Sequence, residues 1–87
     1  PVGRLHLMRG IGFYHAKNPD QAIACCLRAV QLDPRLQEAR IWITRAYLLS
    51  GEPQHARAEL DRLEKSASAQ RFAAEIEQLK QACTEME

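Results

Sequence analysis

The sequence has few aromatic residues, few glycines and prolines, and no long apolar run. Aromatic residues make up 6% of its 87 residues, and it holds four glycines and four prolines. This scarcity argues against a loop-rich, sandwich-like or disordered chain. The longest apolar segments, such as residues 22–27, are too short to cross a bilayer. No signal segment opens the sequence, but its first residue is Pro1 rather than Met, so we keep open that it is a fragment with a signal or anchor upstream.

Residues suited to catalysis or metal binding are scarce as well, and their spacing is unsuitable. The three cysteines are Cys25, Cys26 and Cys83, and an odd number with two adjacent members does not form a disulfide framework. None of the three histidines lies one helical turn from another or beside a C-x2-C pair, as a zinc site requires. We therefore expect no catalytic residue, no metal site and no cofactor. Free cysteines favour a reducing compartment, so we expect a cytoplasmic protein.

Charge is nearly balanced over the whole sequence but unevenly distributed along it. The net charge of +1 leaves no basic surface of the kind that binds nucleic acids, so we expect neither a nucleic-acid partner nor membrane insertion. Residues 1–45 contain seven basic and three acidic side chains, whereas residues 46–87 contain five and eight. This polarity is suited to steering a partner or to head-to-tail stacking of copies. An incidental bias of solvated helix faces is the alternative.

A repeat of 34 residues organises the sequence. Similar residues recur at this spacing, such as Leu7 with Ile41 and Met8 with Trp42. The identical pairs between the two copies are Pro19 and Pro53, Ala22 and Ala56, Ala24 and Ala58, and Arg28 and Arg62. The matched positions follow helical rather than strand spacing, so the sequence predicts two copies of one helical unit.

Turn and capping residues divide each copy into two helices. Asn18 offers an N-cap before Pro19, the string Asp33-Pro34 offers a cap and a first helical residue, and Gly51 marks a helix end before Pro53. We expect helices over about residues 4–16, 19–32, 35–49 and 53–66. Short connections force neighbouring helices to be antiparallel.

A fifth, amphipathic helix is predicted over about residues 69–86. The 34-residue register does not continue into it, because position 74 holds Ala where a third copy would place a large residue. We therefore expect this helix to cap the open end of the second copy. Its apolar stripe consists of Phe72, Ile76, Leu79, Cys83 and Met86.

The two copies resemble the tetratricopeptide repeat family, whose helices read roughly W-x2-L-G-x2-Y and A-x3-F before a closing proline. The positions that correspond in the first copy, about residues 4–34, are His6, Arg9, Gly10, Phe13, Ala22, Cys26, Ala29 and Pro34, and those in the second, about residues 35–68, are Arg40, Ile43, Thr44, Tyr47, Gly51, Ala56, Leu60 and Leu63. The chain departs from the pattern at His6, Arg9 and Arg40, which replace apolar residues, and at Ser68, which replaces the closing proline. The resemblance implies an all-α fold of antiparallel helix-turn-helix repeats in a right-handed superhelix. It also implies one domain over residues 1–87, with a capping helix over about 69–86.

In this family the first helices line a concave face that holds a peptide. The resemblance places a mostly apolar set there: Arg4, Leu7, Met8, Ile11, Tyr14, His15, Glu38, Ile41, Trp42, Arg45, Leu48 and Leu49. Members that clamp a terminal carboxylate present Lys and Asn instead. We expect partner binding by Leu7, Ile11, Tyr14, Ile41, Trp42, Arg45 and Leu48, with Trp42 foremost because tryptophan is enriched where binding energy concentrates. The alternative is burial of the apolar members by a neighbouring repeat, the fifth helix or a second copy.

These features together predict a protein-interaction module, namely an adaptor, an assembly factor or a small chaperone that holds a segment of another protein. The pair of repeats with a closing helix also resembles secretion-system chaperones of this family. A structural or self-association segment of a larger multi-repeat protein is the alternative, because three or more repeats are normally needed to bury a continuous core. A regulatory domain attached to an enzyme or a transcription factor is a third possibility.

Overall fold

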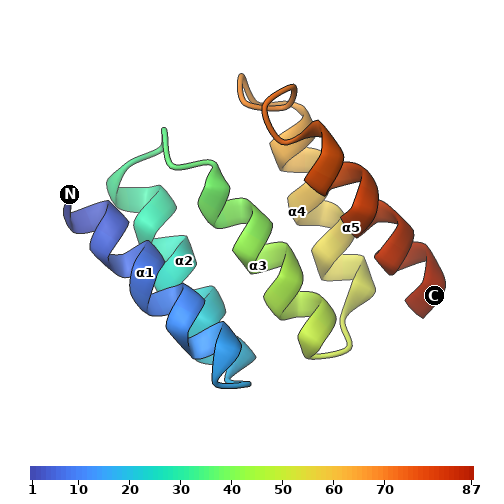
Figure 1. The fold of residues 1–87 in the computed structure, drawn as a ribbon, viewed down its shortest axis with the longest axis horizontal. Coiled ribbons are helices and arrows are strands. Elements are labelled where there is room, and N and C mark those ends of the chain that lie inside the picture. Colours follow the sequence, from blue (N-terminus) through green and yellow to red (C-terminus); the bar gives the residue numbers. More distant parts are fainter.

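Five α-helices make up the chain in a computed structural model that describes residues 1–87. They are α1 (Val2–His15), α2 (Pro19–Leu32), α3 (Glu38–Leu49), α4 (Pro53–Glu64) and α5 (Ala73–Met86). Each helix packs on the next one along the chain, and α3 also contacts α1 and α5. The helices α1, α3 and α5 therefore form one layer, with α2 and α4 behind it (Figure 1). The prediction of an all-helical repeat fold is confirmed.

The turns inside the two repeats have the same construction. Pro19 and Pro53 are the first residues of α2 and α4, where the missing N–H of proline has no cost, as predicted. Two residues before each proline, the chain adopts left-handed backbone, with φ of 65° at Lys17 and 75° at Gly51. This conformation lets Asn18 N donate to the carbonyl of Phe13 at 2.9 Å. Lys17 is thus a non-glycine residue at the position that Gly51 fills without strain.

Three details of the predicted helix ends are wrong. Asn18 makes no side-chain hydrogen bond to α2, so it does not act as a polar N-cap. Helix α3 begins at Glu38 rather than near residue 35, because the Asp33 carboxylate accepts from the backbone N–H of Arg35 at 3.1 Å and fixes a turn there. Residues 66–72 form turns, so α5 begins at Ala73 rather than near residue 69. In that segment the Ser66 hydroxyl donates to the carbonyl of Leu63.

The apolar core consists of two clusters that repeat the same arrangement. The first cluster is formed by Leu7, Cys26, Ala29, Val30, Ala39 and Ile43, which come from α1, α2 and α3. The second is formed by Ile41, Ala56, Leu60, Leu63, Phe72, Ile76, Leu79 and Cys83, which come from α3, α4 and α5. Helix α3 contributes to both clusters through different faces. The same arrangement, in which three helices pack around one apolar cluster, therefore occurs twice in the chain.

Glycine permits the closest approach between α1 and α2. A Cβ atom added to Gly10 would lie 2.5 Å from Cys26 Sγ and 3.2 Å from the carbonyl oxygen of Ala22. No side chain fits there without displacing α2. Phe13 and Tyr47 occupy equivalent positions in the two repeats. Both are half-buried, and Tyr47 packs against both clusters.

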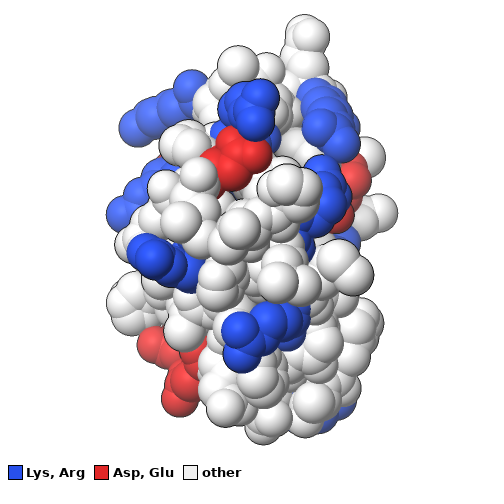
Figure 2. Space-filling model, turned by 90° about the vertical axis from the view of Figure 1, so that its left-hand side faces the viewer, with Lys and Arg blue, Asp and Glu red and all other residues white.

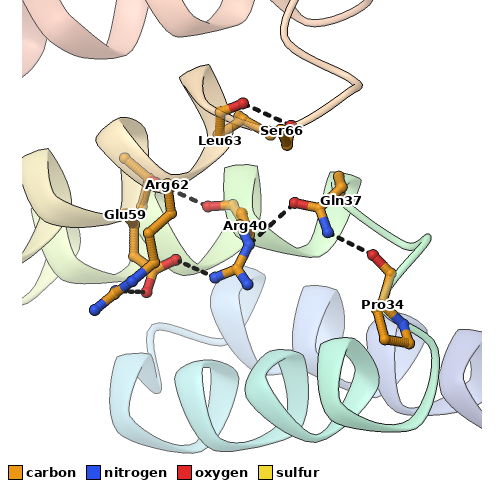
Figure 3. A network of polar contacts seen from close by, with 8 residues as sticks. Pro34, Gln37, Arg40, Glu59, Arg62, Leu63 and Ser66 are labelled. Atoms are coloured by element: carbon orange, nitrogen blue, oxygen red, sulfur yellow. Dashed lines mark hydrogen bonds and ion pairs between the residues drawn. The ribbon is translucent and has the colours of Figure 1, made fainter.

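A polar network joins the second repeat to the turn before it (Figure 3). Glu59 of α4 is 3% exposed, and its carboxylate accepts from Arg40 of α3 at 3.0 Å and from Arg62 at 2.7 Å. Arg40 also donates to the side-chain oxygen of Gln37, whose amide in turn donates to the carbonyl of Pro34. Both oxygens of the buried carboxylate are paired, as a charge removed from water requires. The network fixes α3 against α4.

Candidate functional site

Aromatic side chains from α1 and α3 meet within the layer that α1, α3 and α5 form. The ring of Trp42 lies 5.5 Å from that of Tyr14 and 5.7 Å from that of His15, with both pairs in edge-to-face geometry. Tyr14 and His15 are themselves 5.4 Å apart. Edge-to-face contacts at such distances are favourable for aromatic rings. We call Tyr14, His15, Trp42 and Arg45 the aromatic cluster.

Arg45 completes the cluster from one turn further along α3. Its guanidinium carbon lies 4.6 Å from the centre of the Trp42 ring, within the range of a cation–π contact. A surface ion pair of Arg45 with Glu38 or Asp33 would be the alternative role of this side chain. Asp33 pairs with Arg35 instead, and no carboxylate lies within ion-pair distance of Arg45. The guanidinium therefore keeps donors for an additional acceptor.

The other residues predicted to bind a partner are placed differently. Leu7 is 2% exposed and Ile41 is 3% exposed, and each belongs to one of the core clusters. Their side chains are not accessible on the surface of this chain. Ile11 and Leu48 are half-buried at the borders of the first and second clusters, respectively. Periodicity alone could not separate these roles, because core and surface positions alternate within one turn of the same helix.

The aromatic cluster does not line a pocket. The surface has four hollows, and none is lined by Tyr14, Trp42 or Arg45. The largest, of about 600 Å³, lies at the start of α1 and is lined in part by Val2 and Leu32. A flat aromatic surface can bind an extended or helical segment through ring contacts, but it cannot enclose a small molecule.

Sequence reasoning placed His15 on this face but not among the binding residues, and it missed a second ring pair. The rings of Tyr47 and His55 are stacked 5.2 Å apart, and His55 Nδ1 lies 3.1 Å from a carboxylate oxygen of Glu52. Burial, together with the negative charges of Glu59 and Glu52, raises the pKa of the Tyr47 hydroxyl. The sequence spacing of these residues gives no signal for this pair, because they come from two helices.

Two of the three cysteine thiols are held in the protonated form by burial. Burial, and next the charge of Cys25, raises the pKa of the Cys26 thiol from 9.0 to about 12, and burial also raises the pKa of Cys83. All three thiols are free. No group of three or more His, Cys, Asp and Glu side chains is arranged to hold a metal ion. None of the helices combines the length and apolar character that a membrane crossing needs.

Comparison with known families identifies the fold. The tetratricopeptide repeat model matches residues 13–83, from the last turns of α1 through most of α5. The chain therefore belongs to the tetratricopeptide repeat family, whose members are in general protein–protein interaction modules. No significant match was found among curated proteins or among solved structures.

Proposed function

We propose that this domain holds a segment of another protein on the free face of α1 and α3, with the aromatic cluster as its anchor. The observation that supports this proposal is the group of three half-exposed or exposed rings with a guanidinium stacked on Trp42. Tryptophan, tyrosine and arginine are the residues in which binding energy concentrates at interfaces. A Trp42 ring that served only the apolar core would have no reason to carry the Arg45 guanidinium on its face.

The chemistry of the cluster defines the segment that fits. The rings offer contacts to an aliphatic or aromatic side chain, and the free donors of Arg45 suit a carboxylate beside it. The partner segment thus has an apolar anchor next to Asp or Glu. Ile11 and Leu48 extend the apolar surface on either side. An adaptor, an assembly factor and a small cytoplasmic chaperone are the roles that agree with this chemistry.

The single tryptophan makes the test direct, because all tryptophan fluorescence of the chain comes from Trp42. Peptides selected from a phage-displayed random library on the intact chain are titrated while Trp42 emission is recorded. We expect selected peptides to contain an apolar anchor beside an acidic residue and to shift this emission. Arg45→Gln should weaken their binding about tenfold. Trp42→Ala should weaken it further.

The matched control is Arg71→Gln, because the Arg71 guanidinium stacks on Phe72 at 4.9 Å, away from the cluster. This control should leave peptide affinity unchanged. Peptides that bind without changing Trp42 emission, or that lose as much affinity with Arg71→Gln as with Arg45→Gln, would contradict the proposal.

Self-association or service as part of a larger repeat array is the second candidate function. It is favoured by the exposed apolar residues of α1, namely Val2, Leu5 and Met8, which are 62%, 57% and 63% exposed. Light scattering over a concentration series separates the two functions. A monomer at all concentrations leaves the apolar surface for a different protein, whereas a dimer or larger species shows that copies cover it.

A further inference from the structure

Helix α3 is buried on two sides, but α1 is buried on only one. Ala39, Ile43 and Ala46 lie on the α3 face toward the first repeat and are all 0% exposed. The residues 34 positions earlier are Leu5, Arg9 and Gly12, and all three are exposed. The repeat therefore gives α1 a face that corresponds to a helix-packing face of α3, and no helix within residues 1–87 covers it. We call Val2, Leu5, Met8, Arg9 and Gly12 the outer face of α1.

The outer face has the shape and polarity of a helix contact. Val2, Leu5 and Met8 follow one another at three-residue spacing, which places them along one side of the helix. A Cβ atom added to Gly12 would meet nothing within 4 Å, so a side chain of an approaching helix has room above it. At the start of α1, Val2 shares a shallow pocket with Leu32, which is 41% exposed. The apolar surface thus continues from α1 onto α2.

The helices that carry this apolar strip also carry unpaired basic side chains. Arg4, Arg9, Lys17 and Arg28 are exposed, and none of them makes an ion pair. The first 32 residues hold a single acidic side chain, Asp20. Figure 2 shows this end of the molecule, where Lys and Arg side chains are scattered over a largely uncharged surface with smaller acidic areas among them. The surface therefore favours a partner with negative charge beside an apolar stripe.

A second copy of this chain fits the outer face less well than an amphipathic helix with acidic flanks would. The side of α5 turned away from the core presents Glu77, Gln78 and Gln81, all exposed, and offers no apolar stripe to Val2, Leu5 and Met8. Two outer faces placed together would bring the Arg9 guanidiniums of both copies toward each other. Neither arrangement buries apolar surface against apolar surface without a charge conflict.

We infer that the outer face of α1 binds an amphipathic helix of another protein, with Asp and Glu side chains flanking its apolar stripe. The helix lies along Val2, Leu5 and Met8, approaches most closely over Gly12, and pairs its carboxylates with Arg4, Arg9 and Arg28. None of the outer-face residues belongs to the aromatic cluster, although Met8 is the repeat counterpart of Trp42. The contact between α2 and α3 serves as the model for this complex, because α2 packs on the face of α3 that corresponds to the outer face of α1.

Two synthetic helical peptides test this inference on the intact chain. Both are about 18 residues long and carry the same leucine stripe, but one has Glu and the other Lys at the flanking positions. Binding is followed by fluorescence anisotropy of the labelled peptide at low and raised salt. We expect the Glu-flanked peptide to bind and the Lys-flanked peptide not to bind. The affinity of the Glu-flanked peptide should fall as salt rises, because exposed charges are screened.

Exposed substitutions then locate the site without threatening the fold. Leu5→Ser and Arg9→Glu should each weaken binding of the Glu-flanked peptide about tenfold or more. Lys65→Glu makes the same charge change at the far end of α4, where Lys65 has no ion pair, and should leave the affinity within about twofold. Far-UV circular dichroism checks that each variant keeps its helices.

Several results would overturn the inference. They are absence of binding by the Glu-flanked peptide, equal binding of the Lys-flanked peptide, and equal losses for Arg9→Glu and Lys65→Glu. Loss of binding with Trp42→Ala but not with Leu5→Ser would assign the peptide to the aromatic cluster. A concentration-dependent dimer that Leu5→Ser converts to a monomer would assign the outer face to a second copy. Because the variants differ from those at Trp42 and Arg45, failure here leaves the proposed function standing.

Discussion

The two glycines in the middle of α1 provide a matched test of helix packing. Gly10 faces α2, where an added Cβ atom would lie 2.5 Å from Cys26 Sγ, whereas Gly12 faces open space. Replacing either by alanine gains about 1 kcal/mol from the higher helix propensity of alanine. Gly12→Ala should therefore raise the free energy of unfolding by about that amount, and its effect measures the propensity gain in this helix.

Gly10→Ala receives the same gain but must also make room for a methyl group. Two of the neighbouring atoms are backbone, the carbonyl oxygen of Ala22 at 3.2 Å and the amide nitrogen of Cys26 at 3.3 Å, so a rotamer change of Cys26 cannot relieve all the contacts. Overpacking of this kind costs about 1–3 kcal/mol. We therefore expect Gly10→Ala to be less stable than Gly12→Ala by about 1–3 kcal/mol.

Urea unfolding followed by far-UV circular dichroism measures this difference. A thermal scan should agree, since each kcal/mol shifts the Tm of a domain of this size by about 4–8 °C. In a Cys26→Ala background the sulfur is absent, and the cost of Gly10→Ala should become smaller in a double-mutant cycle. Equal stabilities of the two glycine variants would refute the close approach of α1 to α2. A cost of Gly10→Ala that is undiminished without the sulfur would refute the contact with Cys26 Sγ.

Other predictions concern the buried polar network, the thiols and one turn. Glu59→Gln should lower the free energy of unfolding by about 1–3 kcal/mol, because it leaves the guanidinium groups of Arg40 and Arg62 with a weaker acceptor. In the same urea titration Glu85→Gln should change little, because Glu85 is exposed and makes no ion pair. Peptide mapping after brief iodoacetamide treatment should find Cys25 modified before Cys26, and equal labelling would contradict the burial of Cys26. Between pH 9 and about 12 stability should fall, because the Cys26 thiol ionises in the unfolded chain before it does in the folded one, and Cys26→Ala should flatten that slope. Lys17→Gly should raise the free energy of unfolding by about 1 kcal/mol, and with it the urea midpoint, because glycine adopts the left-handed backbone conformation without strain. An unchanged midpoint would disprove strain at Lys17.

The repeat made the fold accessible from the sequence. The spacing of 34 residues places Pro19 and Pro53 at equivalent helix starts, and both begin a helix in the structure. The ends that depend on side-chain hydrogen bonds were less predictable. Asp33 was expected to open a helix, yet its carboxylate holds the turn after α2, because the same side chain suits both roles and only the tertiary path of the chain decides between them.

The candidate site was predictable only in part. Tyr14, Trp42 and Arg45 were expected on one surface, and the structure brings their side chains together. Leu7 and Ile41, from the same helices, lie in the core. A shift of about one residue around a helix separates core from surface, and this rotation is set by contacts with α2 and α4 that the sequence pattern does not contain. The outer face of α1 became visible only when the exposure of Leu5 and Gly12 was compared with the burial of Ala39 and Ala46.

The order of helix contacts has a consequence for how the chain folds. No helix contacts another more than two places away along the chain, so the native contacts close only short loops. Chains with such local contacts fold in microseconds to milliseconds. Helix α3 contacts all four of the others, whereas α1 and α5 each contact two. Fraying should therefore begin at both ends, and the backbone amides of α3 should be the last to exchange their hydrogens with solvent.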